Sequence, residues 1–347
     1  MRDPLIGNAR SLGGLLMAAG CFVLIGCAKG EDQSVARDRR GCDRGDATSC
    51  YNLGVRYDNG RSVGKDEAKA ATLFQKACDL GEKAGCYNLG VSYHNGNVVP
   101  KDEVKAAALF QKACDLGYGT GCSNLGVCYQ NGSGVAKDEA KAATLYQKAC
   151  DLDDGIGCSN LGVDYQNGNA VPKDEAKAVA LYQKACDLGN GQTCFSLGVG
   201  YQNGRWGAKD ESKAATLYQK ACDLGHVTGC LRLGVCYENG TGVAKDEAKA
   251  ATLYQKACDL GDGEACLNAG FCYAKAIGVV KDGAKAAALF TKACDLGVGD
   301  GCFNLGLCHQ IGIGVAKDEV KAAALFTKAC GLGIAPACDR AKPSGSG

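Results

Sequence analysis

The stretch that decides the fold is Asp66–Gly81, DEAKAATLFQKACDLG, followed at once by Cys86–Asn95, CYNLGVSYHN. In the first segment apolar residues recur at helical spacing from Ala70 to Ala77, which predicts one apolar stripe on an amphipathic helix. Asp66 is a good N-cap acceptor, and Gly81 can adopt the left-handed conformation that ends a helix. The first segment is therefore expected to be a helix with a defined start and stop.

The second segment predicts another, shorter helix with the same periodicity. Its Gly90 would let a neighbouring backbone approach where any Cβ would obstruct it. Asn95-Gly96 is a turn dipeptide, and residues 97–101 then lead to the next N-cap at Asp102. The unit is thus a helix–turn–helix.

This unit recurs every 36 residues without insertion or deletion, and each copy carries two cysteines eight positions apart. A fixed period of this size is typical of a solenoid, in which stacked units share one core. The nine pairs are Cys42 and Cys50, Cys78 and Cys86, Cys114 and Cys122, Cys150 and Cys158, Cys186 and Cys194, Cys222 and Cys230, Cys258 and Cys266, Cys294 and Cys302, and Cys330 and Cys338.

The spacing of each pair favours a disulfide across a helix corner. Along one unbroken helix, eight residues would separate the cysteines by about 12 Å, beyond the limit of roughly 7 Å for a disulfide. Because Gly81 breaks the helix, Cys78 can meet Cys86, and a bridge closing so small a loop adds about 2–3 kcal/mol of stability. A structural zinc site is the alternative, but its ligands usually sit about two to four residues apart.

The phrases Asn124–Val135 (NLGVCYQNGSGV), Lys137–Ala142 (KDEAKA) and Leu145–Cys150 (LYQKAC) resemble the Sel-one-like repeat, a relative of the tetratricopeptide repeat. With the seven-residue gap between cysteines, the chain resembles the Helicobacter cysteine-rich protein family in particular. The resemblance covers Asp46–Leu332, eight repeats, and implies an all-α, right-handed αα-solenoid. The seventh repeat departs from the pattern, because Ala274–Ile277 replaces the usual turn and Gly283 the acidic helix start, so its loop is expected to be altered.

The N-terminus predicts export from the cytoplasm. Two arginines precede Ser11–Gly26, an apolar stretch of 16 residues that is short for a membrane span of about 20. Leu24-Ile25-Gly26-Cys27 resembles a bacterial lipobox, which implies lipidation of Cys27; an ordinary signal peptide or an uncleaved anchor is the alternative. Ala28 lacks the aspartate that retains many such proteins in the inner membrane. With 24 cysteines, the chain is expected in an oxidising compartment, as a periplasmic, outer-membrane or cell-surface lipoprotein.

These observations divide the chain into a signal peptide at 1–26, a polar tether at 27–41, a solenoid at 42–338 and a disordered tail at 339–347. Lys and Arg number 39 against 38 Asp and Glu, and the charges recur within every repeat. No basic stripe is present that could bind nucleic acid, so no nucleic-acid partner is expected. The chain is also expected to be monomeric and to use no cofactor.

Comparison of the repeats distinguishes positions of the shared core, which are nearly constant, from positions that vary between repeats. The sixth residue after each second cysteine varies (Arg56, Ser92, Cys128, Asp164, Gly200, Cys236, Cys272, Cys308), which suggests exposure or local tuning. Four residues earlier on the same helical face a polar residue recurs, and by the resemblance this face lines a concave groove. These residues form the candidate ladder Asn52, Asn88, Asn124, Asn160, Asn268 and Asn304, with Ser196 and Arg232 at the two remaining positions.

Asparagine offers both a donor and an acceptor, so the ladder could pair with the backbone of an extended peptide or protein segment. The alternative is that each asparagine bonds its own neighbours within the solenoid. The unpaired Cys128, Cys236, Cys272 and Cys308 are expected to be free thiols, either buried packing residues or, with His309, a soft-metal or redox site.

Catalysis has little support in the residues. The Helicobacter family carries a β-lactamase and penicillin-binding assignment, and serine β-lactamases use Ser-x-x-Lys with Ser-Asp-Asn and Lys-Thr-Gly. This chain has one Ser-x-x-Lys, Ser62–Lys65, and neither partner motif, so Ser62 and Lys65 are weak catalytic candidates. The favoured function is peptide or protein binding in the groove, with β-lactam binding or hydrolysis as the alternative.

Overall fold

The computed structural model describes residues 32–341, and across that range the chain is all-helical. After α1 (Gln33–Asp43), even-numbered and odd-numbered helices alternate. The even helices are α2 (Ala47–Asn59), α4 (Lys83–Asn95), α6 (Gly119–Asn131), α8 (Gly155–Asn167), α10 (Gly191–Asn203), α12 (Val227–Asn239), α14 (Gly263–Lys275), α16 (Gly299–Ile311) and α18 (Ala335–Arg340). The odd helices are α3 (Glu67–Asp79), α5 (Glu103–Asp115), α7 (Glu139–Asp151), α9 (Glu175–Asp187), α11 (Glu211–Asp223), α13 (Glu247–Asp259), α15 (Gly283–Asp295) and α17 (Glu319–Gly331).

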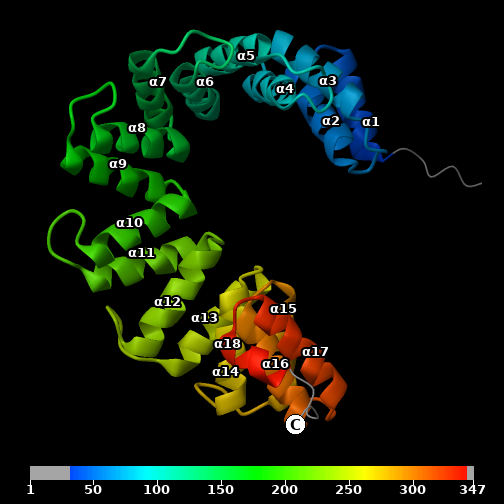
Figure 1. Cartoon of the computed structure of the whole chain (residues 1–347). Coiled ribbons are helices and arrows are strands. Elements are labelled where there is room, and N and C mark those ends of the chain that lie inside the picture. Colours follow the sequence, from blue (N-terminus) through cyan, green and yellow to red (C-terminus); the bar gives the residue numbers. More distant parts are fainter. Residues whose placement is uncertain (1–31, 342–347) are drawn as a thin grey trace, which may run out of the picture.

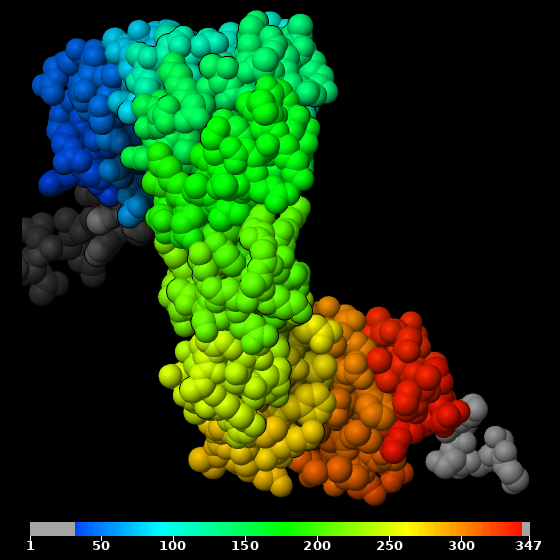
Figure 2. Space-filling model, turned by 90° about the vertical axis from the view of Figure 1, so that its left-hand side faces the viewer, coloured from blue at the N-terminus to red at the C-terminus, as the bar shows by residue number. Residues whose placement is uncertain are grey.

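Each helix packs against the ones before and after it in sequence, so the helices form one continuous array that confirms the expected solenoid. In Figure 1 this array follows an arc, and the loops after α8 and α10 protrude from its outer side. Seen at right angles in Figure 2, the N-terminal and C-terminal repeats are displaced to opposite sides, so the arc is not planar.

The odd helices begin and end as their sequence predicts. The Asp66 side chain accepts a hydrogen bond from the backbone N–H of Lys69, and equivalent aspartates from Asp102 to Asp318 cap the other odd helices. After Asp79 the chain turns at Leu80 and Gly81, and Gly81 has a φ of 90°, which glycine adopts readily.

The even helices are longer than expected. The helix predicted over Cys86–Asn95 begins at Lys83 and has the same 13 residues as its odd neighbour. The prediction was wrong because the corner needs only Leu80–Glu82, after which the Glu82 side chain caps the new helix by accepting from the N–H of Ala84. Gly96, in the left-handed conformation, ends this helix as the turn dipeptide predicted.

All nine cysteine pairs form disulfides between residues eight apart, as predicted, with Cα–Cα distances of 4.4–4.7 Å. Each bridge joins the end of an odd helix, or of α1, to the even helix that follows, so zinc is not needed to explain the spacing. The bonded pairs are Cys42 with Cys50, Cys78 with Cys86, Cys114 with Cys122, Cys150 with Cys158, Cys186 with Cys194, Cys222 with Cys230, Cys258 with Cys266, Cys294 with Cys302, and Cys330 with Cys338.

The close approach expected at Gly90 is also present, although its partner is a side chain rather than a backbone. A Cβ at Gly90 would lie 2.7 Å from the ring of Phe110 on the next odd helix. The glycine therefore provides the space in which the aromatic ring of the following helix packs.

The seventh repeat keeps the regular backbone, contrary to expectation. Ala276 takes the left-handed conformation, with a φ of 60°, where Gly240 and Gly312 stand in the repeats on either side. Helix α15 starts at Gly283 with Asp282 as its N-cap. Packing of the flanking helices therefore imposes the standard turn even where the residue is not glycine.

The polar tether expected at 27–41 overlaps a helix. In α1 Val35 is fully buried and Asp38 is 3% exposed, so residues from Gln33 onward cover the end of the solenoid rather than extend from it. The predicted signal peptide and the lipidation site Cys27 lie outside the described residues. No helix within residues 32–341 is long and apolar enough to cross a membrane.

Candidate functional site

The asparagine ladder lies on one side of the array, which we call the even-helix face. Asn52 is exposed, whereas Asn88, Asn124, Asn160, Asn268 and Asn304 are half-buried. Two of them bond within their own helix: Asn124 Nδ2 donates to the Thr120 carbonyl at 2.9 Å and Asn304 Nδ2 to that of Asp300 at 2.8 Å. At these two positions the amide nitrogen already donates a hydrogen bond within the protein, which leaves the amide oxygen and one N–H for other partners.

Neighbouring even helices are bridged near their N-termini by short side chains. Thr120 and Ser123 of α6 donate to the Asp154 carboxylate, the N-cap of α8, at 2.8 and 2.6 Å. Thr193 of α10 bonds Ser159 of α8 at 3.0 Å. Because these side chains are short, the even helices they join lie close together at this end.

Neighbouring odd helices are bridged instead by long side chains. Lys112 of α5 reaches Asp79 of α3 at 3.4 Å, and Lys220 of α11 reaches Asp187 of α9 at 2.5 Å. Equivalent pairs recur along the array at Lys148–Asp115, Lys256–Asp223, Lys292–Asp259 and Lys328–Asp295. The odd-helix side is thus held by exposed ion pairs of small individual worth.

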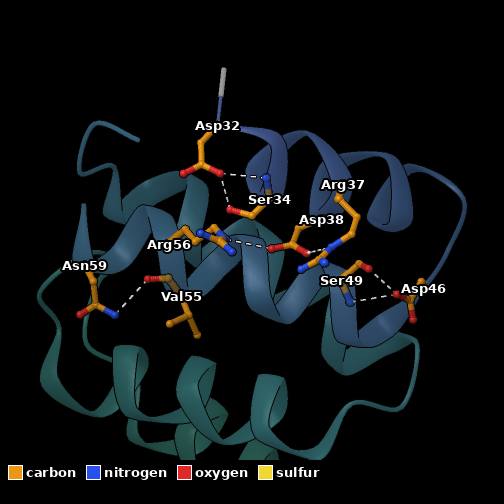
Figure 3. Close-up of polar contacts among 9 residues, drawn as sticks. All are labelled: Asp32, Ser34, Arg37, Asp38, Asp46, Ser49, Val55, Arg56 and Asn59. Atoms are coloured by element: carbon orange, nitrogen blue, oxygen red, sulfur yellow. Dashed lines mark hydrogen bonds and ion pairs between the residues drawn. The ribbon is translucent and has the colours of Figure 1, made fainter. Parts of the chain in front are cut away.

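At the N-terminal end of the even-helix face lies a polar cavity of about 530 Å³, lined by residues of α1, α2 and the loop that follows. Asn52 of the ladder is one of them, together with Arg37, Arg61 and Ser62. Figure 3 shows the polar contacts around it, including Asn59 Nδ2 donating to the Val55 carbonyl at 3.0 Å.

A buried ion pair forms the floor of this cavity. Arg56 Nε lies 2.8 Å from Asp38 Oδ2, and Arg37 Nε lies 3.6 Å from Oδ1 of the same carboxylate (Figure 3). At its rim, hydrogen bonds from the hydroxyl and backbone N–H of Ser34 and from Ser62 lower the pKa of Asp32 to about 2. The positive charges of Arg56 and Arg37 are thus partly balanced by the negative charge of Asp38.

The Ser-x-x-Lys candidates are not arranged for catalysis. Ser62 lies in a bend with a φ of 64°, and its hydroxyl bonds Asp32. Lys65 Nζ lies 2.6 Å from Glu67 Oε1, a contact that raises the pKa of the lysine. A lysine stabilised as a cation cannot activate a serine as a general base, so β-lactamase chemistry is not favoured.

The varying position is mostly buried, which fits local tuning rather than exposure and, for the four cysteines, the alternative of buried packing residues. Cys128, Cys236, Cys272 and Cys308 are free thiols that lie 3–7% exposed in the core. Burial raises the pKa of Cys128 and of Cys272 to about 11, which makes these thiols poor nucleophiles. Within the described residues no cluster of three or more His, Cys, Asp or Glu side chains could hold a metal ion.

In the fourth and fifth repeats this position is buried but carries Asp164 and Gly200 in place of a cysteine. Asp164 is 4% exposed, and burial, followed by the charge of Glu139, raises its pKa to about 6. Gly200 is covered by the indole of Trp206, whose Cζ3 lies 1.9 Å from where a Cβ would stand. Beside this indole a second cavity, of about 220 Å³, opens between α8 and α10 and includes the ladder residue Ser196. Sequence comparison marked the glycine but gave no signal for Trp206 or the cavity.

The array is a disulfide-clamped helical repeat scaffold, and comparison with known proteins specifies its kind. The Sel1 repeat model matches residues 47–82, 83–118, 120–154, 156–190, 192–226, 227–262, 263–298 and 299–334. The chain therefore belongs to the Sel1 repeat family. No curated protein matches it.

Solved structures include other proteins of this kind. The chain is similar to c5321, a protective antigen of uropathogenic Escherichia coli strains, with 29% identity and a TM-score of 0.69 over 88% of this chain and 66% of that one, so it spans just under two thirds of c5321. It is 28% identical to a Sel1 repeat protein from Oxalobacter formigenes, with a TM-score of 0.56 and 88% of each chain covered. It is 41% identical to Helicobacter pylori cysteine rich protein B over 38% of this chain and 93% of that one, with a TM-score of 0.31.

Proposed function

We propose that this protein is an extracytoplasmic scaffold that binds an extended peptide or protein segment along its even-helix face. The observation that carries the proposal is the row of exposed and half-buried amide side chains at equivalent positions in α2, α4, α6, α8, α14 and α16, with Ser196 and Arg232 at the same position in α10 and α12. Such a row offers donors and acceptors at a regular spacing to a backbone of any sequence.

The surroundings of the row support the proposal. Short hydroxyl and carboxylate bridges draw the even helices together, which favours a groove on this side, and two cavities open along it next to Asn52 and Ser196. Nine disulfides indicate an oxidising compartment. We propose a monomer, secreted across the inner membrane and tethered through lipid on Cys27, that meets envelope or host partners.

The experiment is a pull-down from envelope or host extract with the exported protein, followed by titration of the recovered partner. Replacing Asn88, Asn124 and Asn160 together by alanine should remove about 2–4 kcal/mol of binding free energy, a loss of about 30- to 1,000-fold in affinity. Single substitutions should be weak, because one hydrogen bond is worth about 0.5–1.5 kcal/mol.

The matched control replaces Asn95, Asn131 and Asn167, exposed asparagines at the last turn of the same three helices. It removes equal numbers of amides from equal helices, and affinity should be retained. Helical circular dichroism of both triple variants should match the parent. Parental affinity in the ladder variant, or loss of binding only with loss of helicity, would contradict the proposal.

A further inference from the structure

The cavity between α8 and α10, which we call the seam cavity, arises from two coupled exceptions in the fifth repeat. In four other repeats a glycine with positive φ stands at the position of Trp206: Gly134, Gly242, Gly278 and Gly314. A Cβ at these four glycines would lie 1.9–2.1 Å from a backbone carbonyl oxygen of the preceding odd helix, so a side chain at this position needs a different loop path. Ser62, Val98 and Ala170 hold the position in the first, second and fourth repeats, but each is much smaller than an indole. The tryptophan must therefore place its indole elsewhere.

The missing side chain at Gly200 provides the space. The indole lies over this glycine, between Tyr182 at 6.3 Å and Tyr201 at 5.7 Å between ring centroids. With Val163 and Leu197, the indole and Tyr182 form an apolar wall for the seam cavity. Val163 is 37% exposed, so this wall is open to solvent.

The rest of the lining is polar and held in place. Thr193 donates to Ser159 Oγ at 3.0 Å, and Tyr182 donates to Gln166 Oε1 at 3.2 Å, so hydroxyl and amide groups link α8 to α9 and α10 around the opening. Arg205 is the one charged side chain in the lining, and the lining contains no carboxylate. Its guanidinium lies 5.9 Å from the centre of the Trp206 ring system.

The size, chemistry and position of the seam cavity define an occupant. Its volume of about 220 Å³ is below the range of about 300–1,000 Å³ typical of small-molecule sites, and suits a single large side chain. Buried aromatic and aliphatic side chains are the usual anchors of protein interfaces. A positive rim without acidic residues favours a negative charge next to that anchor.

We propose that the seam cavity receives one aromatic or branched apolar side chain of an extended partner segment, with a carboxylate on the adjoining residue facing Arg205. The proposal rests on the proposed function, because it names the point at which a segment on the even-helix face is anchored. It specifies an acidic-apolar partner sequence that the asparagine ladder, which would read only backbone, does not require.

The test uses Trp206 as its own probe, since the chain contains one tryptophan. The exported protein is titrated with the peptide acetyl-Gly-Gly-Phe-Glu-Gly-Gly-amide while indole emission is followed. A saturable change is expected by millimolar concentration, and replacing Phe by Ser should weaken binding at least about tenfold. Replacing Glu by Gln should weaken it about two- to fivefold, with loss of the salt dependence.

Variants of the cavity lining test whether the change in indole emission comes from peptide bound in the seam cavity. Val163→Glu places a carboxylate in the apolar wall and should abolish the titration, whereas Ile156→Glu, at an exposed site on the same helix outside the cavity, should leave it unchanged. Arg205→Gln should equalise the Glu and Gln peptides. No saturable binding of any peptide, binding without a change in emission, or equal binding by Val163→Glu and the parent would overturn the proposal.

The recovered protein partner separates this inference from the proposed function. If the ladder variant loses the partner and Val163→Glu keeps it, binding on the even-helix face stands and the anchor proposal fails. If the ladder variant keeps the partner while Val163→Glu loses it, the anchor stands and the role of the asparagines fails.

Discussion

Arg56 Nε lies 2.8 Å from Asp38 Oδ2, and this contact fastens the first helix to the repeat array. Asp38 is 4% exposed at its side chain and Arg56 20%, so removing one partner leaves a charge with little access to water. We expect Asp38→Ala to cost about 2–4 kcal/mol locally, somewhat less than a fully buried pair. Amide hydrogen exchange should rise in α1 and α2 and stay unchanged in α9–α16, because solenoid repeats are stabilised by their neighbours.

Exchanging the two charges, in Asp38→Arg with Arg56→Asp, should recover part of this protection. Equal exchange rates in Asp38→Ala and the parent would show that the ion pair does not hold α1 in place.

The corner disulfides are expected to act singly and locally. Replacing Cys150 and Cys158 together by alanine should lower the unfolding free energy by about 2–3 kcal/mol, since the closed loop is short. Denaturant titration gives the loss, and peptide mapping without reduction should find the other eight links unchanged. Cys128→Ala, which removes a buried sulfur outside any bridge, is the control and should cost less. A larger loss from the control would contradict the assignment of stability to the bridge.

Asp164 should make the folded protein less stable as the pH rises from about 4 to about 6. Its folded pKa of about 6 lies above the ordinary value of 3.8, so the folded state binds the proton more tightly than the unfolded state. Its stabilising contribution is therefore present below about pH 4 and lost as the pH rises to about 6, with a limit of about 3 kcal/mol. The lowered pKa values of capping aspartates such as Asp66 and of His226 act in the opposite sense, destabilising the fold as the pH falls.

Asp164→Cys isolates this effect, because it gives the fourth repeat the residue found in four others and leaves the remaining titrating groups unchanged. Above pH 6 the variant should be more stable than the parent, and the difference should shrink on acidification to pH 4. A difference that does not vary with pH would mean that Asp164 stays ionised in the folded state.

Ala276 and Gly240 form a matched pair for the left-handed turn after an even helix, with φ of 60° and 71°. We expect Ala276→Gly to stabilise the protein by about 1 kcal/mol and Gly240→Ala to destabilise it by a similar amount, because a Cβ is strained in this conformation. The space around Gly240 is adequate, since its nearest contact to a Cβ would be 3.4 Å. Thermal unfolding of both variants checks the signs; two changes in the same direction would contradict the argument.

The sequence predicted what depends on local chemistry. Aspartate caps such as Asp66, the glycine corner at Gly81 and the cysteine spacing determined helix order and disulfide pairing, because each involves residues close in the chain. The early start of the even helices was missed, although Asp154 and Asn190, which cap α8 and α10, were recognisable signals.

The parts that were not predicted depend on contacts between distant residues. That α1 packs on the array follows from Asp38 meeting Arg56, and sequence gives no reason to pair them. For Cys128 the sequence left burial and a reactive site both open, because burial depends on contacts with α5 and α7. The seam cavity arises only when the glycine at 200 and the tryptophan at 206 are seen together in space.

Each of the nine disulfides within residues 32–341 begins and ends inside one helix–corner–helix unit, so none of them joins one unit to the next. A 36-residue unit can therefore be duplicated or deleted in the gene without separating the two cysteines of any bridge or forcing a new pairing during oxidative folding. Partner preference can evolve separately, through exceptions confined to a single unit such as the one at Trp206. The protein can change its reach and its selectivity by independent genetic steps.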